Sequence, residues 1–141
     1  MERIDTNSDK RLFGEYAVLA VGLKPAEQKQ FVELATNHSE ELKVVFGTKA
    51  DLNVKLGDIL AKEHLHGMGE EFSVPVTIVM SGFKEKEVAQ FIQRLRQTNF
   101  GIKLLAVLTE TSSNWKLKEL LAELVKEAME LSRKKKKRDQ P

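Results

Sequence analysis

The chain has 141 residues, of which 41% are hydrophobic and 31% are charged, the composition of an ordinary soluble domain with its own core. It contains no cysteine, which excludes disulfides, thiolate metal sites and thiol nucleophiles. No apolar h-region opens the chain and no apolar run reaches membrane-spanning length, so we expect a cytoplasmic protein with no membrane partner.

The net charge of +2 conceals a strongly basic end. Six basic residues are consecutive there: Arg133, Lys134, Lys135, Lys136, Lys137 and Arg138. Without them and Asp139, 17 of the 23 basic residues and 20 of the 21 acidic residues remain, so the body of the chain is acidic. We expect residues 133–141 to form a solvated, disordered tail. The alternative is that the tail binds the phosphates of a nucleic acid, although no nucleic-acid-binding motif accompanies it.

The first half of the chain predicts two strands, each followed by a helix. Tyr16–Val21 is a continuous apolar run, which is typical of a strand buried on both faces. Pro25 suits the first turn of the next helix, where its missing N–H costs nothing. Leu42–Phe46 predicts a second strand, and a short helix follows Asn53. The glycine-containing stretch Leu65–Ser73 predicts a linker.

The second half predicts the same order of elements. Val76–Met80 predicts a strand, and Ile102–Leu108 predicts another, entered through Gly101 at the expected end of a helix. Between them, apolar residues at i, i+3, i+4 and i+7 predict an amphipathic helix: Val88, Phe91, Ile92 and Leu95. A final helix is predicted from another apolar stripe: Leu117, Leu120, Leu121, Leu124, Ala128 and Leu131.

The two halves also match residue by residue at a spacing of about sixty positions. Twelve pairs are identical, with a shift of one residue after the sixth: Gly22/Gly82, Lys24/Lys84, Glu27/Glu87, Gln30/Gln90, Phe31/Phe91, Lys43/Lys103, Thr48/Thr109, Asn53/Asn114, Lys55/Lys116, Leu56/Leu117, Leu60/Leu121 and Ala61/Ala122. Average composition would give roughly three by chance. We therefore predict an internal duplication, with units over about residues 16–64 and 75–131 of a single domain spanning residues 1–132.

Alternating strands and helices predict an α/β fold with a small parallel four-stranded sheet. If each unit contributes two neighbouring strands joined by a right-handed crossover, and a pseudo-twofold axis runs between the first and third strands, the strand order is 2-1-3-4. The first and fourth helices would then cover one face of the sheet, and the second and third helices the other. A ferredoxin-like α+β arrangement is the alternative.

In a parallel sheet of this order, the ends of the first and third strands would form a crevice. Gly22-Leu23-Lys24 and Gly82-Phe83-Lys84 would line it, each at the N-terminus of a helix, where backbone N–H groups favour anions. We therefore treat Gly22, Lys24, Gly82 and Lys84 as candidate ligands of a phosphate or carboxylate. The simpler interpretation is that each glycine allows a turn and each lysine is solvated.

Other polar residues predict little chemistry. Thr109 and Asn114 precede the final helix and could bind an oxyanion, but such residues more often cap their own helix. His64 and His66 are spaced i, i+2 with no third ligand nearby, so no metal site is predicted. We find no catalytic constellation and expect no cofactor.

Three blocks in the second half resemble an uncharacterised bacterial family, the domain of unknown function 3783. They are Thr77–Phe83, Leu105–Thr109 and Asn114–Leu121, and the resemblance covers about residues 75–130. Members often carry a small polar or acidic residue where this chain has Lys84. The resemblance implies a small bacterial cytoplasmic α/β protein, and it implies no activity or site residue because the family has none assigned.

Our leading hypothesis is a non-enzymatic cytoplasmic module that binds another protein. One alternative is a small-molecule-binding protein or weak enzyme that uses the crevice between Gly22 and Gly82. A second alternative is an RNA-associated accessory protein that acts through the basic tail. An exposed edge strand of the sheet would also permit a homodimer.

Overall fold

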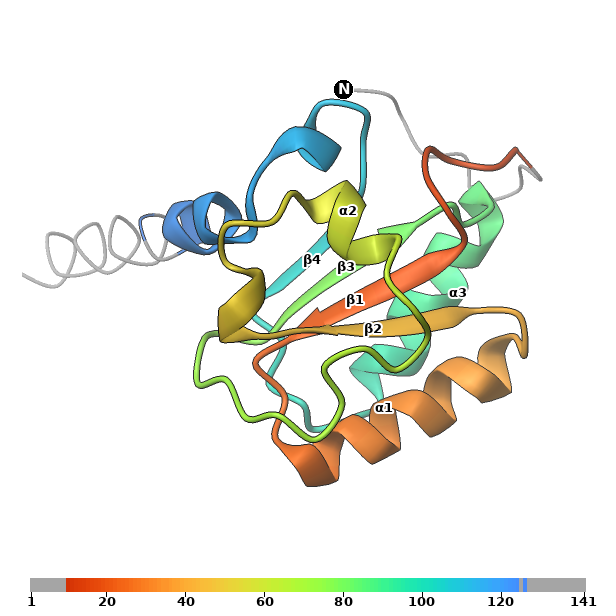
Figure 1. Ribbon diagram of the computed structural model, residues 1–141. Helices are drawn as coiled ribbons and strands as arrows, with labels where there is room; N and C mark the ends of the chain where they lie inside the picture. The colour runs from red at the N-terminus through yellow and green to blue at the C-terminus, as the bar shows by residue number, and fades with distance from the viewer. Residues whose placement is uncertain (1–9, 125, 127–141) are drawn as a thin grey trace, which may run out of the picture.

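The computed structural model describes residues 10–124 and 126, and shows one sheet with helices on both faces (Figure 1). The strands are β1 (Ala17–Val21), β2 (Lys43–Gly47), β3 (Thr77–Ser81) and β4 (Leu104–Val107). The helices are α1 (Pro25–His38), α2 (Leu56–Leu60) and α3 (Glu85–Arg96), with single 3-10 turns η1 (Lys49–Asp51) and η2 (Ser112–Asn114) and a last helix over residues 117–124. No helix within this described part is long and apolar enough to cross a membrane. The basic residues 133–138 lie outside the described residues.

The strand order is β2-β1-β3-β4, as predicted. The two outer pairs, β1 with β2 and β3 with β4, are parallel. The central pair is antiparallel, with Ala17 opposite Ser81 and Val21 opposite Thr77, so the prediction of an entirely parallel sheet is wrong at its centre.

The route of the chain after α2 explains this reversal. The Leu65 N–H donates to the Val44 carbonyl at 2.7 Å, and the Phe46 N–H donates to the His66 carbonyl at 2.8 Å. Residues 64–66 therefore run beside β2 in the same direction as β2. This segment returns the chain to the carboxyl ends of β1 and β2, so β3 starts there and runs back antiparallel to β1.

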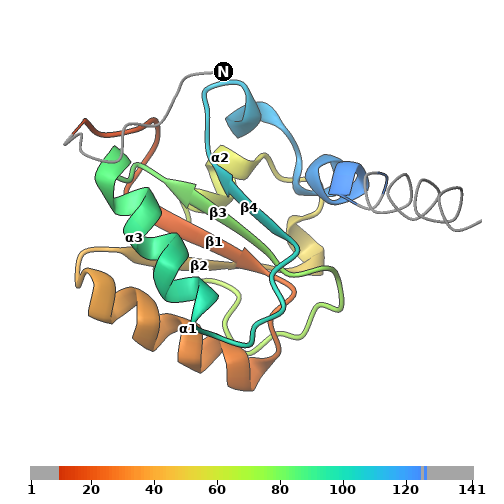
Figure 2. The same ribbon diagram turned by 180° about the vertical axis from the view of Figure 1, so that it is seen from behind.

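The reversal also changes which helices share a face. α1 and α3 cover one face of the sheet, and α2 and the last helix cover the other (Figures 1 and 2). Phe31 of α1 and Phe91 of α3 meet edge to face with ring centroids 6.3 Å apart, in one buried cluster. Leu56 of α2 and Leu117 of the last helix belong to the cluster on the other face. The predicted grouping of first with fourth and second with third helices is therefore wrong.

Two pairs of equivalent residues from the two sequence units face each other. Leu19 lies opposite its equivalent Val79 at the middle of the central strand pair. On the face that α2 covers, Lys55 and its equivalent Lys116 form an isolated antiparallel bridge. Flanking N–H groups donate reciprocally: Leu56 to the Trp115 carbonyl at 2.8 Å and Leu117 to the Val54 carbonyl at 3.1 Å. This pattern is that of a local twofold axis perpendicular to the sheet.

Candidate functional site

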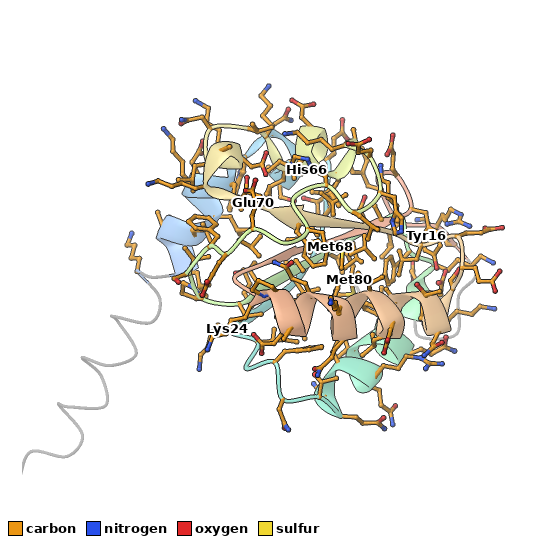
Figure 3. All side chains as sticks on the ribbon, turned by 60° about the horizontal axis from the view of Figure 1, so that its bottom comes forward. Tyr16, Lys24, His66, Met68, Glu70 and Met80 are labelled. Carbon is orange, nitrogen blue, oxygen red and sulfur yellow. The ribbon has the colours of Figure 1, made fainter. Side chains whose placement is uncertain are left out.

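The two predicted anion-binding loops lie at opposite ends of the sheet. Lys24 and Tyr16 stand at the two ends of β1 (Figure 3). The Tyr16 hydroxyl donates to Glu87, in the first turn of the helix that follows Lys84. Lys84 is therefore at the Tyr16 end, and the crevice between the Gly22 and Gly82 loops does not form. The antiparallel central pair is the cause, because it separates the carboxyl ends of β1 and β3.

The Gly82 loop is closed by residues 10–14, which pass directly over it. The Gly82 N–H donates to the Phe13 carbonyl at 2.9 Å, and the Glu85 N–H donates to the Lys10 carbonyl at 3.0 Å. A Cβ atom at Gly82 would lie 2.5 Å from the Gly14 carbonyl oxygen. The glycine thus allows close passage of the backbone, and the amides that would attract an anion already have protein acceptors.

The Gly22 loop is covered in the equivalent way by the linker before β3. A Cβ atom at Gly22 would lie 2.5 Å from the Val74 carbonyl oxygen. Gln28 ties the same loop to the linker, since its side-chain amide donates to the Leu23 and Glu70 carbonyls at 3.2 and 2.9 Å. Both loops are therefore explained by packing of the chain against itself.

Thr109 and Asn114 belong to one exposed turn around η2. The Thr109 N–H donates to the Ser112 hydroxyl at 2.9 Å, and the Asn114 side-chain amide donates to the Glu110 carbonyl at 3.3 Å. These groups stabilise their own turn around η2, and the bonds they make do not reach the first turn of the last helix.

A charged cluster that sequence reasoning missed surrounds Asp51. Its side chain is 1% exposed and accepts hydrogen bonds from the Thr48 N–H (2.9 Å), the Thr48 hydroxyl (3.0 Å), Lys62 Nζ (2.7 Å) and His66 Nε2 (3.1 Å). Burial alone would raise the pKa of Asp51, but the hydrogen bonds from Lys62, Thr48 and His66 outweigh it and lower the pKa to about 2. In the second unit the equivalent turn is closed by the neutral Ser112, so the turn itself does not require a charge.

A second cluster joins Tyr16, which directly precedes β1, with His38 of α1 and Glu87 of α3. Glu87 Oε2 accepts from the Tyr16 hydroxyl at 2.5 Å and contacts His38 Nε2 at 3.0 Å. Burial, followed by the hydrogen bond to Glu87, raises the pKa of Tyr16 to about 12. The Glu87 pKa is lowered, because contacts with Tyr16, the Lys84 N–H and His38 outweigh burial. No sequence signal marked this cluster, since Tyr16 and Glu87 are 71 positions apart.

Neither cluster brings together a metal-binding set. Among the residues that the structure describes, no group of three or more His, Asp or Glu side chains could hold a metal ion. His64 is instead used by the backbone, since its Nδ1 accepts the Val44 N–H at 3.1 Å. Both clusters therefore join elements of the fold.

The two edges of the sheet differ sharply. The free edge of β2 is covered by residues 64–66, which bond to Val44 and Phe46. On β4, Leu104 and Leu108 donate their N–H groups inward, to Val76 and Met80 of the β3 side. Backbone groups alternate along a strand, so the N–H and C=O groups of Leu105 and Val107 point outward. Within residues 10–124 they have no backbone partner.

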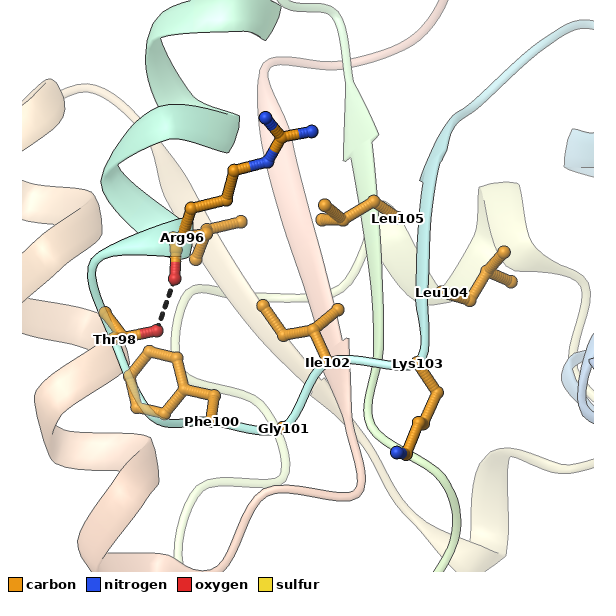
Figure 4. A pocket seen from close by; sticks show the side chains of 9 residues that line it. Arg96, Thr98, Phe100, Gly101, Ile102, Lys103, Leu104 and Leu105 are labelled. Carbon is orange, nitrogen blue, oxygen red and sulfur yellow. Dashed lines mark hydrogen bonds between the residues drawn. The ribbon is translucent and has the colours of Figure 1, made fainter.

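A pocket of about 380 Å³ adjoins this open edge (Figure 4). It lies between the end of α3 and the start of β4 and is lined by Leu95, Arg96, Thr98, Phe100, Gly101, Ile102, Lys103, Leu104 and Leu105. Its side chains are mostly apolar, and the charged members are Arg96 and Lys103. Both cations are exposed and form no ion pair with another described residue. The outward backbone groups of Leu105 and Val107, together with the residues that line this pocket, form the surface that we call the β4 site.

The β4 site lies within the part of the chain that matches a protein-family model. No curated protein and no solved structure matches the chain. One family model matches from the first residue of β3 onward, and the match includes α3, β4 and every residue that lines the pocket. Residues 77–131 of this chain are thus similar to the family described as Domain of unknown function (DUF3783).

Proposed function

We propose that this chain is a non-enzymatic protein-interaction module that takes an extended segment of another protein as an additional strand beside β4. One observation carries the proposal: among the described residues, the outward backbone groups of Leu105 and Val107 have no backbone partner, and they lie beside a pocket lined by both apolar and polar groups. Strand addition uses such main-chain groups for affinity, and neighbouring side-chain pockets supply specificity. The absence of cysteine supports a cytoplasmic location.

The contrast between the edges supports this function. Edge strands are a liability, and proteins protect them with charges, prolines, bulges or a covering segment. This chain uses residues 64–66 to cover β2. The strand Leu104–Val107 carries no charge and no proline, and all four of its residues are only partly buried. An edge of this kind is suited to a partner strand.

The polar groups elsewhere favour binding over catalysis. The carboxylates of Asp51 and Glu87 are engaged by neighbouring side chains. The backbone amides at Gly82 and Glu85 are engaged by residues 10–14. The β4 site therefore offers a surface whose backbone groups remain available to a partner.

A proline at position 107 tests the proposal, because it removes one outward N–H and leaves the inward ladder bonds intact. Peptides would be selected on the wild-type chain from a random dodecapeptide phage library. We expect binding to be lost on Val107→Pro and on Leu105→Pro, and retained on Val107→Ala, which keeps the N–H. Amide exchange at Leu105 and Val107 should slow when a selected peptide is added.

Two results would count against the proposal. Peptides that bind Val107→Pro as tightly as wild type would show that another surface is used. A wild-type dimer that Val107→Pro dissociates, measured by sedimentation, would show that β4 pairs with a second copy of the chain. Circular dichroism of each variant establishes that the sheet is intact.

A further inference from the structure

From the charges around the β4 site we infer the chemistry of its partner: an acidic extended segment that places an aliphatic side chain in the pocket. This inference rests on the proposed function, because it assigns the occupant of the same surface. It concerns a segment of a different protein, and a second copy of this chain is the alternative that sedimentation of wild type and Val107→Pro tests.

The first argument is electrostatic. Residues 94–109, from the end of α3 through β4, contain three basic residues and no acidic residue: Arg94, Arg96 and Lys103. All three are exposed and without an ion pair among the described residues. The rest of the body is acidic overall. A local positive patch on such a body orients and accelerates the approach of a negative partner.

The second argument is geometric. Leu105 and Val107 pack toward the face that α1 and α3 cover, and the pocket also lies beside the end of α3 (Figure 4). Side chains of an added strand alternate between the two faces. Every second side chain of the partner would therefore reach the pocket side, where Leu95, Phe100 and Ile102 favour an aliphatic group. A volume of about 380 Å³ is within the range of ligand pockets.

The same charges disfavour a second copy of this chain as the occupant. A copy paired through its own β4 would present residues 103–108, which include Lys103 and no acidic residue. Arg96 and Lys103 would then gain no counter-charge from the paired strand. A segment that carries Asp or Glu beside its aliphatic residues supplies that charge.

Three synthetic decapeptides test this inference. In each, valine alternates with one other residue, which is Glu, Gln or Lys. We expect the Glu peptide to bind the wild-type chain about tenfold more tightly than the Lys peptide, with the Gln peptide between them. The difference should shrink when salt is raised to about 0.5 M. Isothermal titration calorimetry measures all three affinities.

Charge-reversed variants identify the residues responsible. Arg96→Glu with Lys103→Glu should reverse the order of the three peptides. The matched control is Lys29→Glu with Lys49→Glu, two exposed lysines on α1 and η1. It changes the net charge equally and should leave the order unchanged. Equal effects of both double variants would overturn the inference, since only overall charge would then matter.

The outcomes also separate this inference from the proposed function. If the three peptides bind equally and Val107→Pro abolishes all binding, the acidic partner is wrong and strand addition stands. If the Glu peptide binds Val107→Pro as well as wild type, strand addition fails and the inference fails with it. No binding of the Glu peptide up to about 1 mM overturns the acidic partner.

Discussion

Replacing Asp51 with asparagine should remove a pH-dependent part of the stability of this fold. The Asp51 carboxylate is 1% exposed and accepts bonds from Thr48, Lys62 and His66. Its pKa is lowered from 3.8 to about 2 in the folded chain. A difference of that size between the folded and unfolded states corresponds to about 2 kcal/mol of stability.

The sign follows from the direction of the shift. A carboxyl whose folded-state pKa is lowered contributes its stability above its unfolded pKa, and the contribution is lost as pH falls through the folded pKa. For Asp51 this window runs from about pH 4 down to about pH 2. Urea unfolding of wild type and Asp51→Asn across this window measures the effect. We expect the difference in unfolding free energy to shrink by about 2 kcal/mol as pH falls.

Because Glu87 also has a lowered pKa, only the difference between wild type and variant isolates Asp51. A difference that stays constant between about pH 4 and pH 2 would refute the reasoning. Ser112→Ala is the control at the equivalent turn of the second unit, where Ser112 accepts the Thr109 N–H. That change should cost about 1 kcal/mol with no dependence on pH.

Five further substitutions probe the packing. Ser81→Ala should raise the unfolding free energy by about 1 kcal/mol, because the buried Ser81 hydroxyl has no hydrogen-bond partner among the described residues; a less stable variant in urea unfolding would contradict this. Gly82→Ala should cost about 3 kcal/mol or more, since its Cβ would lie 2.5 Å from a backbone oxygen at a φ of +67°. Gly101 has a similar φ, and no atom of the described residues would lie within 4 Å of its added Cβ, so Gly101→Ala should cost only about 1 kcal/mol. Equal losses of melting temperature in the two variants would show that the backbone contact at Gly82 is not the cause. Val107→Pro should lower stability by less than about 1 kcal/mol, whereas Ala106→Pro, which removes an inward ladder bond, should cost about 3 kcal/mol. Similar denaturation curves for the two proline variants would mean that the Val107 N–H does not point outward.

The amino-acid pattern alone was sufficient for the elements and their order. Apolar runs such as Tyr16–Val21 placed every strand of the sheet, and the repeat, with a right-handed crossover in each unit, predicted the order 2-1-3-4. The resemblance over about residues 75–130 agrees with the family match over residues 77–131. These features depend on local hydrophobic periodicity and on residue identity, which a single sequence carries directly.

Strand direction and the binding surface were decided only by the tertiary structure. A strand buried on both faces has the same apolar pattern whichever way it runs. Nothing in Thr77–Ser81 therefore indicates that β3 is antiparallel to β1. The direction depends on residues 64–66, whose backbone bonds to β2 turn the chain back. Those bonds separate the Gly22 and Gly82 loops, cover one edge of the sheet and leave β4 open. Backbone hydrogen bonds between distant segments carry no residue signature, and for that reason the β4 site became visible only in the folded chain.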